Sequence, residues 1–335
     1  MNKLFGTTPK DLAHAATLLR AGEIVALPTE TVYGLACLAL NTDAVAKVFA
    51  AKNRPANDPL IVHVTDLPAA HTVCLPDKRA VSLAESFWPG PLTFVLPKTD
   101  CVPDLVTSGL PTVAVRSPAH PVFREILNLT NAPLAAPSAN PFGRVSPTRA
   151  EHIMESFGPE HPHIVDGGAT DIGIESTVLD LSSSRPRILR PGPIGLKDMA
   201  EILGSKPDLH EELLGEPTPE NIISPGLLSK HYRPQSPLRI FPDSLALVSF
   251  LEQEATLPGT IVLLHAPLEK TLLPANLSIL PLSQTGEHND IAHNLFARLR
   301  EADACSPPLI LCSLLPEEGI ARAINDRLRR AAGED

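Results

Sequence analysis

The sequence lacks the cysteine spacing that is typical of zinc sites and disulfide frameworks. Its cysteines are odd in number and none forms a C-x-x-C pair, so we expect buried, reduced thiols at Cys37, Cys74, Cys101, Cys305 and Cys312. The N-terminus lacks a signal-type apolar core, and no uninterrupted apolar run approaches the ~18 residues of a membrane span. We therefore expect a cytoplasmic protein that makes no use of a membrane.

An excess of basic residues is also missing. The chain has 28 Lys and Arg against 38 Asp and Glu, which gives a formal net charge of -10. Proteins that coat nucleic acid or anionic membrane usually carry a basic excess, so this balance argues against both roles. Any cationic site must be local. The length of 335 residues, 43% of them hydrophobic, is enough for about two domains with cores of their own.

The common catalytic and nucleotide-binding motifs are absent as well. The sequence contains no G-x-x-x-x-G-K-[ST] phosphate loop and no G-x-G-x-x-G after a strand. It contains neither H-E-x-x-H nor G-x-S-x-G, the signatures of a metalloprotease helix and a nucleophile elbow. If the protein binds a nucleotide, it must do so by another device.

What is present is an alternation of helix and strand patterns over the first two hundred residues. A helix is predicted from Thr8 as N-cap and Pro9 as first helical residue to Gly22, and a strand follows at 23–28. Further helices are predicted near 43–53, 76–87 and 119–128, with strands at 59–64, 92–97, 112–116 and 133–138. This alternation predicts an α/β or α+β sheet domain over residues 8–203.

The composition changes between residues 204 and 237, which are dense in proline and polar residues and are predicted to form a linker. A second alternating block follows over 238–333. Its predicted strands are LRIF, TIVLLH, LSILPL and LILCSLL, and its predicted helices lie near 243–255, 288–303 and 317–332. This pattern indicates a small doubly wound α/β domain.

Cations and small hydroxyls stand at the ends of several predicted elements in the first domain. Lys52 and Arg54 end a helix, while Arg116 and Arg190 each end a strand. Ligands of open α/β sheets bind at strand ends, and guanidinium groups suit phosphates and carboxylates. A single such residue is usually a solvated surface cation. Four of them in one domain favour an anion site, with hydroxyl and amide groups added by Ser138, Asn140 and Ser146.

Other polar residues have an ordinary structural interpretation beside the functional one. His63 lies in the apolar run LIVHV, where a buried, hydrogen-bonded core histidine is the more common case. Glu30 is interpretable as a helix cap and Glu175 as the start of a strand. Asp166 in IVDGG suits a turn better than a metal site. Turn and core positions are likewise available for Thr31 and Tyr33.

A family resemblance rests on many separate motifs. LPTETVYGL, KNRPANDPLIVHV, WPGPLTFVL, TVAVRSPAHP, APSAN, SPT, DGG, GIESTVLDL and ILRPGP occur in the order seen in the Sua5/YciO/YrdC family. The later SPGLLSKHYRP and GIARAINDRLRRAA resemble the linker and C-terminal domain of the longer, Sua5-type members. The resemblance implies a YrdC-like twisted, mixed α/β sheet domain with a concave cationic site, followed by a smaller doubly wound, Rossmann-like Sua5 domain.

The activity that this resemblance implies is that of an L-threonylcarbamoyladenylate synthase, a nucleotidyltransferase. Such enzymes use L-threonine, bicarbonate and ATP with Mg²⁺, and release pyrophosphate and water. A downstream tRNA threonylcarbamoyltransferase then modifies adenosine 37 to t6A. The chemistry needs positioning and cationic stabilisation at the α-phosphorus but no protein nucleophile, which agrees with the absent catalytic motifs.

The resemblance also implies roles for individual residues. Lys52 and Arg54 are the implied catalytic cations. The residues implied to bind ATP are Arg54, Asp58, Thr112, Ser138, Asn140, Ser146, Arg190 and Tyr232. Those implied to bind L-threonine are Thr31, His63, Arg116, Ala136 and Ser176, with Arg116 as partner of the substrate carboxylate. The linker, with His231 and Tyr232, is predicted to cover the nucleotide. The sequence identifies no metal ligand.

Asp58 departs from the family pattern, in which this position is commonly Asn. A carboxylate repels a triphosphate unless a metal ion lies between them, so the sequence leaves its nucleotide contact open. Three other functions also stay open. One is a double-stranded RNA or tRNA-binding protein, with at most a weak RNA contact expected. The second is a carbamoyl-transfer enzyme related to hydrogenase maturation proteins, whose accompanying zinc-finger and acylphosphatase segments are not visible here. The third is a regulatory protein without catalysis.

Overall fold

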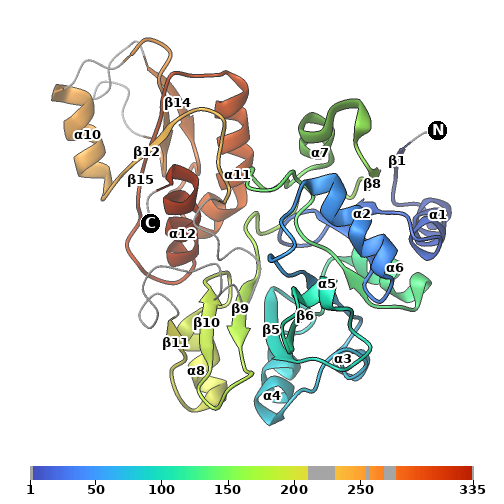
Figure 1. Cartoon of the computed structure of the whole chain (residues 1–335). Coiled ribbons are helices and arrows are strands. Elements are labelled where there is room, and N and C mark those ends of the chain that lie inside the picture. Colours follow the sequence, from blue (N-terminus) through green and yellow to red (C-terminus); the bar gives the residue numbers. More distant parts are fainter. Residues whose placement is uncertain (1–2, 210–230, 254–256, 268–276, 334–335) are drawn as a thin grey trace. The chain divides into compact units, whose positions relative to one another are not determined.

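The computed structural model describes residues 3–209, 231–253, 257–267 and 277–333. The chain divides into two compact units (Figure 1). The first consists of Met1–Phe142, Ser146–Asp171 and Glu175–Leu228, and the second of Gly143–Val145, Ile172–Ile174 and Ser229–Asp335. The boundaries proposed from the sequence, 8–203, 204–237 and 238–333, stay predictions, because most of the linker lies outside the described residues.

The first unit is built on a mixed sheet of eleven strands, as the family resemblance implied. At the centre of the sheet β4 (Ile61–His63) and β6 (Thr112–Arg116) are parallel, whereas β6 and β5 (Leu92–Pro97) are antiparallel. The carboxyl ends of neighbouring strands therefore lie at both ends of the sheet. In spatial order the strands are β1 (Leu4–Phe5), β8 (His163–Val165), β2 (Val25–Leu27), β3 (Gly34–Leu38), β7 (Leu134–Ala135), β4 (Ile61–His63), β6 (Thr112–Arg116), β5 (Leu92–Pro97), β9 (Thr177–Asp180), β10 (Arg187–Arg190) and β11 (Asp208–Leu209).

The first helix of this unit begins at the signal that the sequence displays. Helix α1 (Pro9–Arg20) has Thr8 as its N-cap, and the Thr8 side chain accepts a hydrogen bond from the Asp11 amide. Leu12, Leu19 and Phe123 help to pack α1 and α6 on one side of the sheet. The other helices are α2 (Thr42–Lys52), α3 (Leu67–Ala70), α4 (Lys78–Phe87), α5 (Asp104–Thr107), α6 (Pro121–Thr130), α7 (Ala150–Phe157) and α8 (Leu196–Leu203), with a 3-10 turn at Gly158–Glu160.

The second unit contains a four-stranded sheet in the order β12-β15-β13-β14, and every pairing in it is parallel. Its strands are β12 (Leu238–Phe241), β13 (Ile261–Leu264), β14 (Ser278–Pro281) and β15 (Ile310–Ser313), and its helices are α10 (Ser244–Gln253), α11 (His288–Ala304) and α12 (Ala321–Ala332). Leu247, Val262 and Leu311 form part of one buried cluster between helix and sheet. The small α/β domain predicted from the sequence is confirmed.

The expectation for the cysteines is only partly right. All five are free thiols, and Cys37, Cys74 and Cys312 are buried. Burial raises the pKa of the Cys37 thiol to about 12. Cys101 and Cys305 are exposed, because one lies in the turn after β5 and the other is the C-cap of α11. Within the described ranges, no helix combines the length and the apolar character that crossing a membrane requires.

Candidate active site

The end of α2 brings the Lys-x-Arg and Ser-x-Asn motifs together. After Lys52 the chain turns at Asn53, whose left-handed backbone (φ 50°) ends the helix. The Lys52 ammonium donates to the backbone carbonyl of Ser138 at 2.5 Å and to that of Asn140. Two motifs that are 86 residues apart therefore form one structure.

Lys52 is almost completely buried, with 1% of its surface exposed. Burial, together with the neighbouring Arg54, holds the pKa of Lys52 well below its usual range, while Asp58 opposes this shift. An anion bound beside Lys52 would favour the protonated ammonium. In the structure Lys52 positions the Ser138–Asn140 loop. Its direct contact with substrate stays a prediction.

Arg54 and Asp58, which are four residues apart in sequence, form a buried ion pair. Arg54 Nη2 lies 2.8 Å from Asp58 Oδ2, and the two side chains are 3% and 0% exposed. Arg54 also donates to the carbonyls of Asp58 and Pro59, at 3.0 and 2.8 Å. Among the described residues neither oxygen of Asp58 accepts a hydrogen bond, so charge attraction holds the carboxylate at the arginine.

Asp58 lies among three cations. Burial raises its pKa, whereas Arg54, Lys52 and Arg190 lower it, in that order of influence. We call Lys52, Arg54 and Arg190, with Asp58 among them, the cation cluster. Three positive groups and a single carboxylate, removed from water, make a site whose charge suits a polyanion such as a triphosphate.

Replacing Asp58 with asparagine is expected to strengthen ATP binding. The carboxylate competes with phosphate for Arg54, so its removal is expected to lower the KM for ATP by roughly threefold to tenfold. Arg54 keeps its two carbonyl partners in the variant. Steady-state kinetics with varied ATP measure the change, and Asp77→Asn, which removes a carboxylate paired with Arg79 outside the site, is the control. A raised KM in the Asp58 variant would show that the carboxylate assists the nucleotide.

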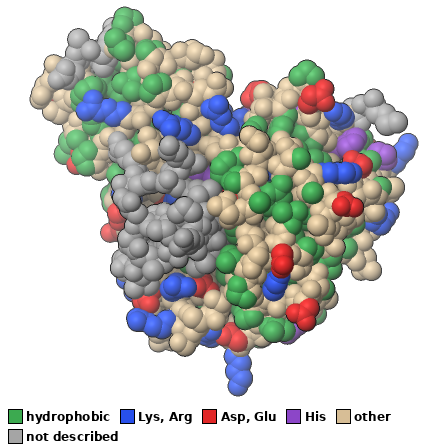
Figure 2. Space-filling view, in the orientation of Figure 1, with side chains coloured by type: hydrophobic (Ala, Val, Ile, Leu, Met, Phe, Trp, Pro, Cys, Tyr) green, Lys and Arg blue, Asp and Glu red, His purple; other side chains and the backbone are tan. Residues whose placement is uncertain are grey.

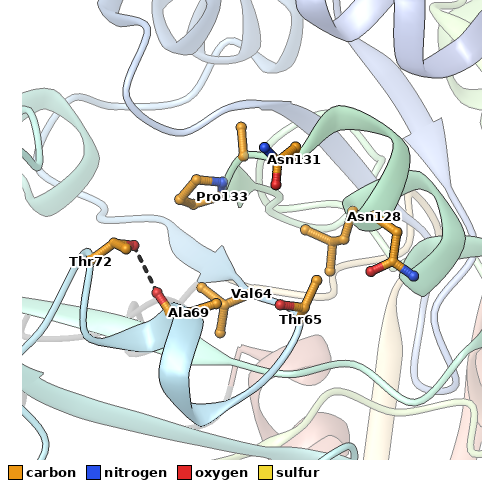
Figure 3. A pocket seen from close by; sticks show the side chains of 9 residues that line it. Val64, Thr65, Ala69, Thr72, Asn128, Asn131 and Pro133 are labelled. Carbon is orange, nitrogen blue, oxygen red and sulfur yellow. Dashed lines mark hydrogen bonds between the residues drawn. The ribbon is translucent and has the colours of Figure 1, made fainter.

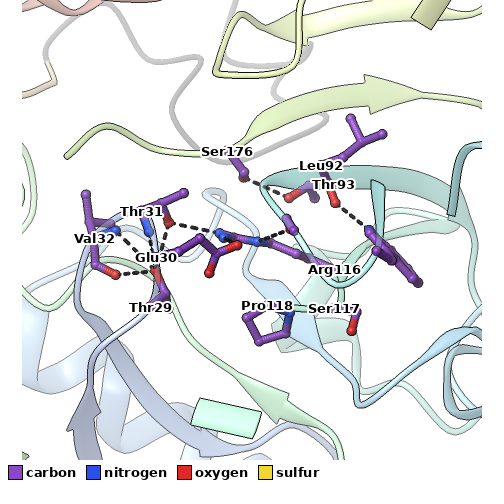
Figure 4. Close-up of polar contacts among 12 residues, drawn as sticks. Thr29, Glu30, Thr31, Val32, Leu92, Thr93, Arg116, Ser117, Pro118 and Ser176 are labelled. Atoms are coloured by element: carbon purple, nitrogen blue, oxygen red, sulfur yellow. Dashed lines mark hydrogen bonds and ion pairs between the residues drawn. The ribbon is translucent and has the colours of Figure 1, made fainter. Parts of the chain in front are cut away.

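Arg190 connects the cation cluster to Ser176. Its guanidinium donates to the Ser176 carbonyl from Nε at 3.2 Å and from Nη2 at 3.1 Å, and to Ser176 Oγ at 3.2 Å. The Ser176 hydroxyl also lies 2.8 Å from Thr93 Oγ1 (Figure 4). Arg190 ends β10 and Ser176 precedes β9, which pair antiparallel, so the sheet itself places the predicted ATP and threonine contacts side by side.

Gly192 packs directly against the Ser176 backbone. A methyl group at this position would lie 2.6 Å from the Ser176 carbonyl carbon and would overlap the Thr177 amide. Gly192→Ala is expected to lower the free energy of unfolding by about 1–3 kcal/mol and to raise the KM for threonine, because Ser176 must shift. Thermal unfolding and kinetics measure both effects. In the control Gly6→Ala the new methyl group meets only Asp11 Oδ2 at 3.4 Å, and wild-type values for both variants would refute the prediction.

A second group forms around Arg116, which is 3% exposed. Its Nη1 donates to Thr31 Oγ1 at 3.0 Å, its Nη2 to Glu30 Oε1 at 2.5 Å and its Nε to the Gly90 carbonyl at 3.1 Å (Figure 4). Thr31 Oγ1 lies 2.8 Å from Thr29 Oγ1, whose own oxygen accepts from the Thr31 and Val32 amides. These bonds use three of the five N–H groups of the guanidinium.

His63 lies beside Arg116 on the neighbouring parallel strand, since the two are register partners of β4 and β6. Its ring packs on Phe123 at 4.9 Å, and it is 3% exposed. Burial, reinforced by Arg116, lowers the pKa of His63 to about 3, so the ring is neutral at physiological pH. The sequence expectation of a buried core histidine is confirmed, and its predicted threonine contact would be made by a neutral imidazole.

Ala136 follows β7, where its amide donates to the Ile61 carbonyl at 3.0 Å. A side chain at Gly34 would lie 3.1 Å from the Ala136 methyl group, so both positions are restricted to small residues. Gly34 in turn bridges to Ser138, and the Ala139 amide donates to the Tyr33 carbonyl. The TETVYG and APSAN segments thus lie against each other.

Three predicted residues stand apart from these two groups. The Ser146 hydroxyl donates to Glu175 Oε1 at 2.6 Å, next to Ser176 in sequence. Thr112 begins β6, at the opposite end of the strand from Arg116, and no described hydrogen bond or ion pair joins it to the cation cluster. Tyr232 belongs to the second unit. The ATP contacts of these residues stay predictions.

No site role was predicted from the sequence for Glu30, Thr93 or Gly192. The interpretation of Glu30 as a helix cap does not hold, because no helix begins there and its carboxylate pairs with Arg116. The sequence signal was an acid flanked by threonines in PTET, and pattern alone cannot pair this acid with an arginine 86 residues away. Asp166 is a turn residue as predicted, accepting from the Gly168 amide at 2.9 Å.

A separate pocket of about 320 Å³ opens near the ends of β4, α3 and α6 (Figure 3). Thr65, Thr72, Asn128 and Asn131 supply its polar groups, and no charged side chain lines it. None of the predicted site residues is in its lining. Among the described residues on the face that Figure 2 shows, basic and acidic side chains are interspersed.

Metal ligands are not evident in the described parts of the chain. They contain no group of three or more His, Cys, Asp or Glu side chains that is arranged to hold a metal ion. Asp58 is the acidic residue nearest to the cations, and its oxygens have the capacity to accept further contacts. ATP-bound Mg²⁺ is usually held by phosphates, waters and few protein groups, so it does not require a set of protein ligands.

The fold and the two residue groups define a YrdC-like α/β protein with a buried cation cluster and a neighbouring arginine-threonine site, joined to a second parallel α/β unit. A family model described as "Telomere recombination" (Sua5_yciO_yrdC) matches residues 17–192, and one described as "Threonylcarbamoyl-AMP synthase, C-terminal domain" matches 194–333. The chain therefore belongs to the Sua5/YciO/YrdC family, with the C-terminal domain of its Sua5-type members.

Individual relatives match over nearly the whole chain. A protein named threonylcarbamoyl-AMP synthase from Bacillus subtilis is 39% identical, over 98% of this chain and 94% of its own. The structure of Pyrococcus abyssi Sua5 complexed with L-threonine superposes with a TM-score of 0.89 at 35% identity and covers 98% and 97% of the two chains. A variant of the same Sua5, with a histidine and the following tyrosine both replaced by alanine, gives 0.88 at 35% identity, over 99% and 97%.

Proposed function

We propose that the protein makes L-threonylcarbamoyl-AMP from L-threonine, bicarbonate and ATP, and that it releases pyrophosphate and water. The observation that carries the proposal is the agreement along the chain with relatives named for this activity, together with the threonine complex of a related structure. The site geometry supports it, because a cation cluster for a triphosphate lies next to an arginine-threonine group suited to an amino acid.

The reaction can be assigned to the two groups. Arg116 binds the threonine carboxylate with its remaining N–H groups, and Thr31, Ser176, Ala136 and the neutral His63 surround the rest of the amino acid. The carbamate oxygen then attacks the α-phosphorus, and Arg54, Arg190 and Lys52 stabilise the charge that accumulates as pyrophosphate leaves. The class of this step is nucleotidyl transfer. Mg²⁺ bound with ATP would neutralise phosphate charge.

The product implies two further partners. A mixed anhydride of a carbamate and AMP hydrolyses readily, so a transferase must accept the threonylcarbamoyl group soon after it forms. We propose that this partner is the tRNA threonylcarbamoyltransferase of t6A37 synthesis. A direct contact of this chain with tRNA would be weak, given the net charge of -10.

Pyrophosphate release tests the proposal. The purified protein is incubated with ATP, Mg²⁺ and bicarbonate, and with L-threonine, L-serine or no amino acid. Release that requires both threonine and bicarbonate is the expected result. No threonine-dependent release from a folded protein would refute the synthase and favour the binding or regulatory alternatives.

Tyr232→Phe is expected to weaken the use of ATP without unfolding the protein. In the second unit the Tyr232 ring is fully buried, stacks on Phe296 at 5.4 Å and lies under the Arg327 guanidinium at 5.5 Å. Phenylalanine preserves these ring contacts and removes only the hydroxyl that the resemblance assigns to ATP. We expect a KM for ATP raised roughly fivefold to tenfold, the usual cost of one lost hydrogen bond. Unchanged KM and turnover would refute the assignment.

A further inference from the structure

Glu30 presents a buried acceptor that the protein leaves without a donor. Its Oε1 accepts from Arg116 at 2.5 Å, but its Oε2 is buried and accepts no hydrogen bond among the described residues. The residue is 5% exposed. A buried carboxylate oxygen without a donor is unfavourable and rare, so its retention requires an explanation. One such explanation is that a bound ligand supplies the missing hydrogen-bond donor.

The position of this oxygen indicates which donor is missing. Glu30 lies beside Thr31 and Arg116 (Figure 4), the two residues that the proposed function places around the amino-acid substrate. A free amino acid is a zwitterion whose carboxylate and ammonium groups are attached to one carbon. Arg116 and Glu30 present the complementary charges at 2.5 Å from each other. This arrangement matches both ends of the zwitterion.

We propose that Glu30 binds the α-ammonium group of the amino-acid substrate through Oε2 and accepts the proton that the amine must lose. The proposal rests on the proposed function and deepens it, because it identifies the base of the carbamate-forming step. The ammonium and bicarbonate combine to give the carbamate, one water and one proton. The N–C bond forms, one C–O bond of bicarbonate breaks with its oxygen leaving as water, and Glu30 takes the proton.

The charged and titratable groups around Glu30 come from several elements. Arg116 from β6 is ion-paired with Glu30, and the neutral His63 adds no charge. His120, the N-cap of α6, is electrostatically coupled to Glu30 and Asp171. Burial lowers the pKa of His120, and the two acids oppose that shift.

The test compares Glu30→Gln and Glu30→Asp with wild type in the full chain, at saturating ATP and bicarbonate and with threonine varied at several pH values. Glutamine retains an acceptor for Arg116 but neither binds the ammonium as an anion nor takes its proton. We expect the KM for threonine to rise at least tenfold and kcat to fall, with both partly restored at alkaline pH, where more amine is already neutral. Aspartate retains the charge on a shorter side chain, so a raised KM with the wild-type pH profile is expected.

The controls separate this role from a purely structural one. Glu23→Gln removes an exposed glutamate paired with Lys47 and is expected to behave as wild type. Thermal unfolding verifies that each variant is folded. If Glu30→Gln lost activity equally at every pH, or retained the wild-type KM and pH profile, the assignment would be overturned.

A binding measurement distinguishes failure of this inference from failure of the proposed function. Calorimetric titration of L-threonine, without ATP or bicarbonate, needs no turnover. If wild type released no pyrophosphate but bound threonine more tightly than Glu30→Gln, the synthase would be refuted while the ammonium contact would stand. If both proteins bound threonine equally, or neither bound it, the ammonium contact would be overturned.

Discussion

Arg54→Ala is expected to lower threonine-dependent pyrophosphate release by roughly a thousandfold, because a preorganised cation opposite the transferring phosphoryl group is lost. The loss has a second part. Asp58 would be left as a buried carboxylate with its nearest cation removed, and it would then repel the triphosphate. Breaking one side of a buried ion pair also costs about 3–5 kcal/mol of stability.

The double variant Arg54→Ala/Asp58→Asn separates these two contributions. Removing the carboxylate is expected to recover most of the lost stability, whereas activity stays low because the guanidinium is still missing. Chemical denaturation and pyrophosphate release measure the two quantities on the same samples. If activity returned together with stability, Arg54 would be a structural partner of Asp58 and not a contact of the nucleotide.

Arg116→Lys is expected to lower kcat/KM for threonine by roughly a hundredfold while leaving the KM for ATP nearly unchanged. Lysine retains the charge but cannot reproduce a planar fork that already serves Gly90, Thr31 and Glu30. The matched control is Arg124→Lys. Arg124 donates to the Thr65 and Pro118 carbonyls from the next helix and has no predicted site role. An equal rise in both Michaelis constants would indicate that Arg116 supports the whole site and is not specific to threonine.

The sequence was most informative where local chemistry determines the structure. The Thr8 cap and Pro9 place the start of α1 correctly, and strong apolar runs place β4, β5 and β6. Strand β3, with the sequence GLACL, was not predicted, since its small residues resemble those of a loop or a helix equally well. Its register with β7, which pairs Cys37 with Ala135, depends on a segment far away in the sequence.

The site could be predicted as a set of residues but not as a set of contacts. Lys52 and Arg54 are close in sequence, yet their contacts differ. Lys52 donates a hydrogen bond to the Ser138–Asn140 loop, whereas Arg54 forms an ion pair with Asp58. The sequence left open whether Asp58 faces the cations. The structure places it among them, because the chain turns after α2 and returns as β4. The pairing of Arg116 with Glu30 joins the end of β6 to the connection between β2 and β3, 86 residues away, and could not be foreseen from spacing.

The most direct test of the central claim is to detect the product itself. The protein is incubated with ATP, Mg²⁺, L-threonine and ¹³C-labelled bicarbonate, quenched rapidly and examined by mass spectrometry. The account predicts an adenylate that contains threonine and one labelled carbon, formed by wild type and by Arg124→Lys but not by Arg54→Ala. A folded wild-type protein that forms only unlabelled threonyl adenylate, or no threonine-containing adenylate at all, would contradict it.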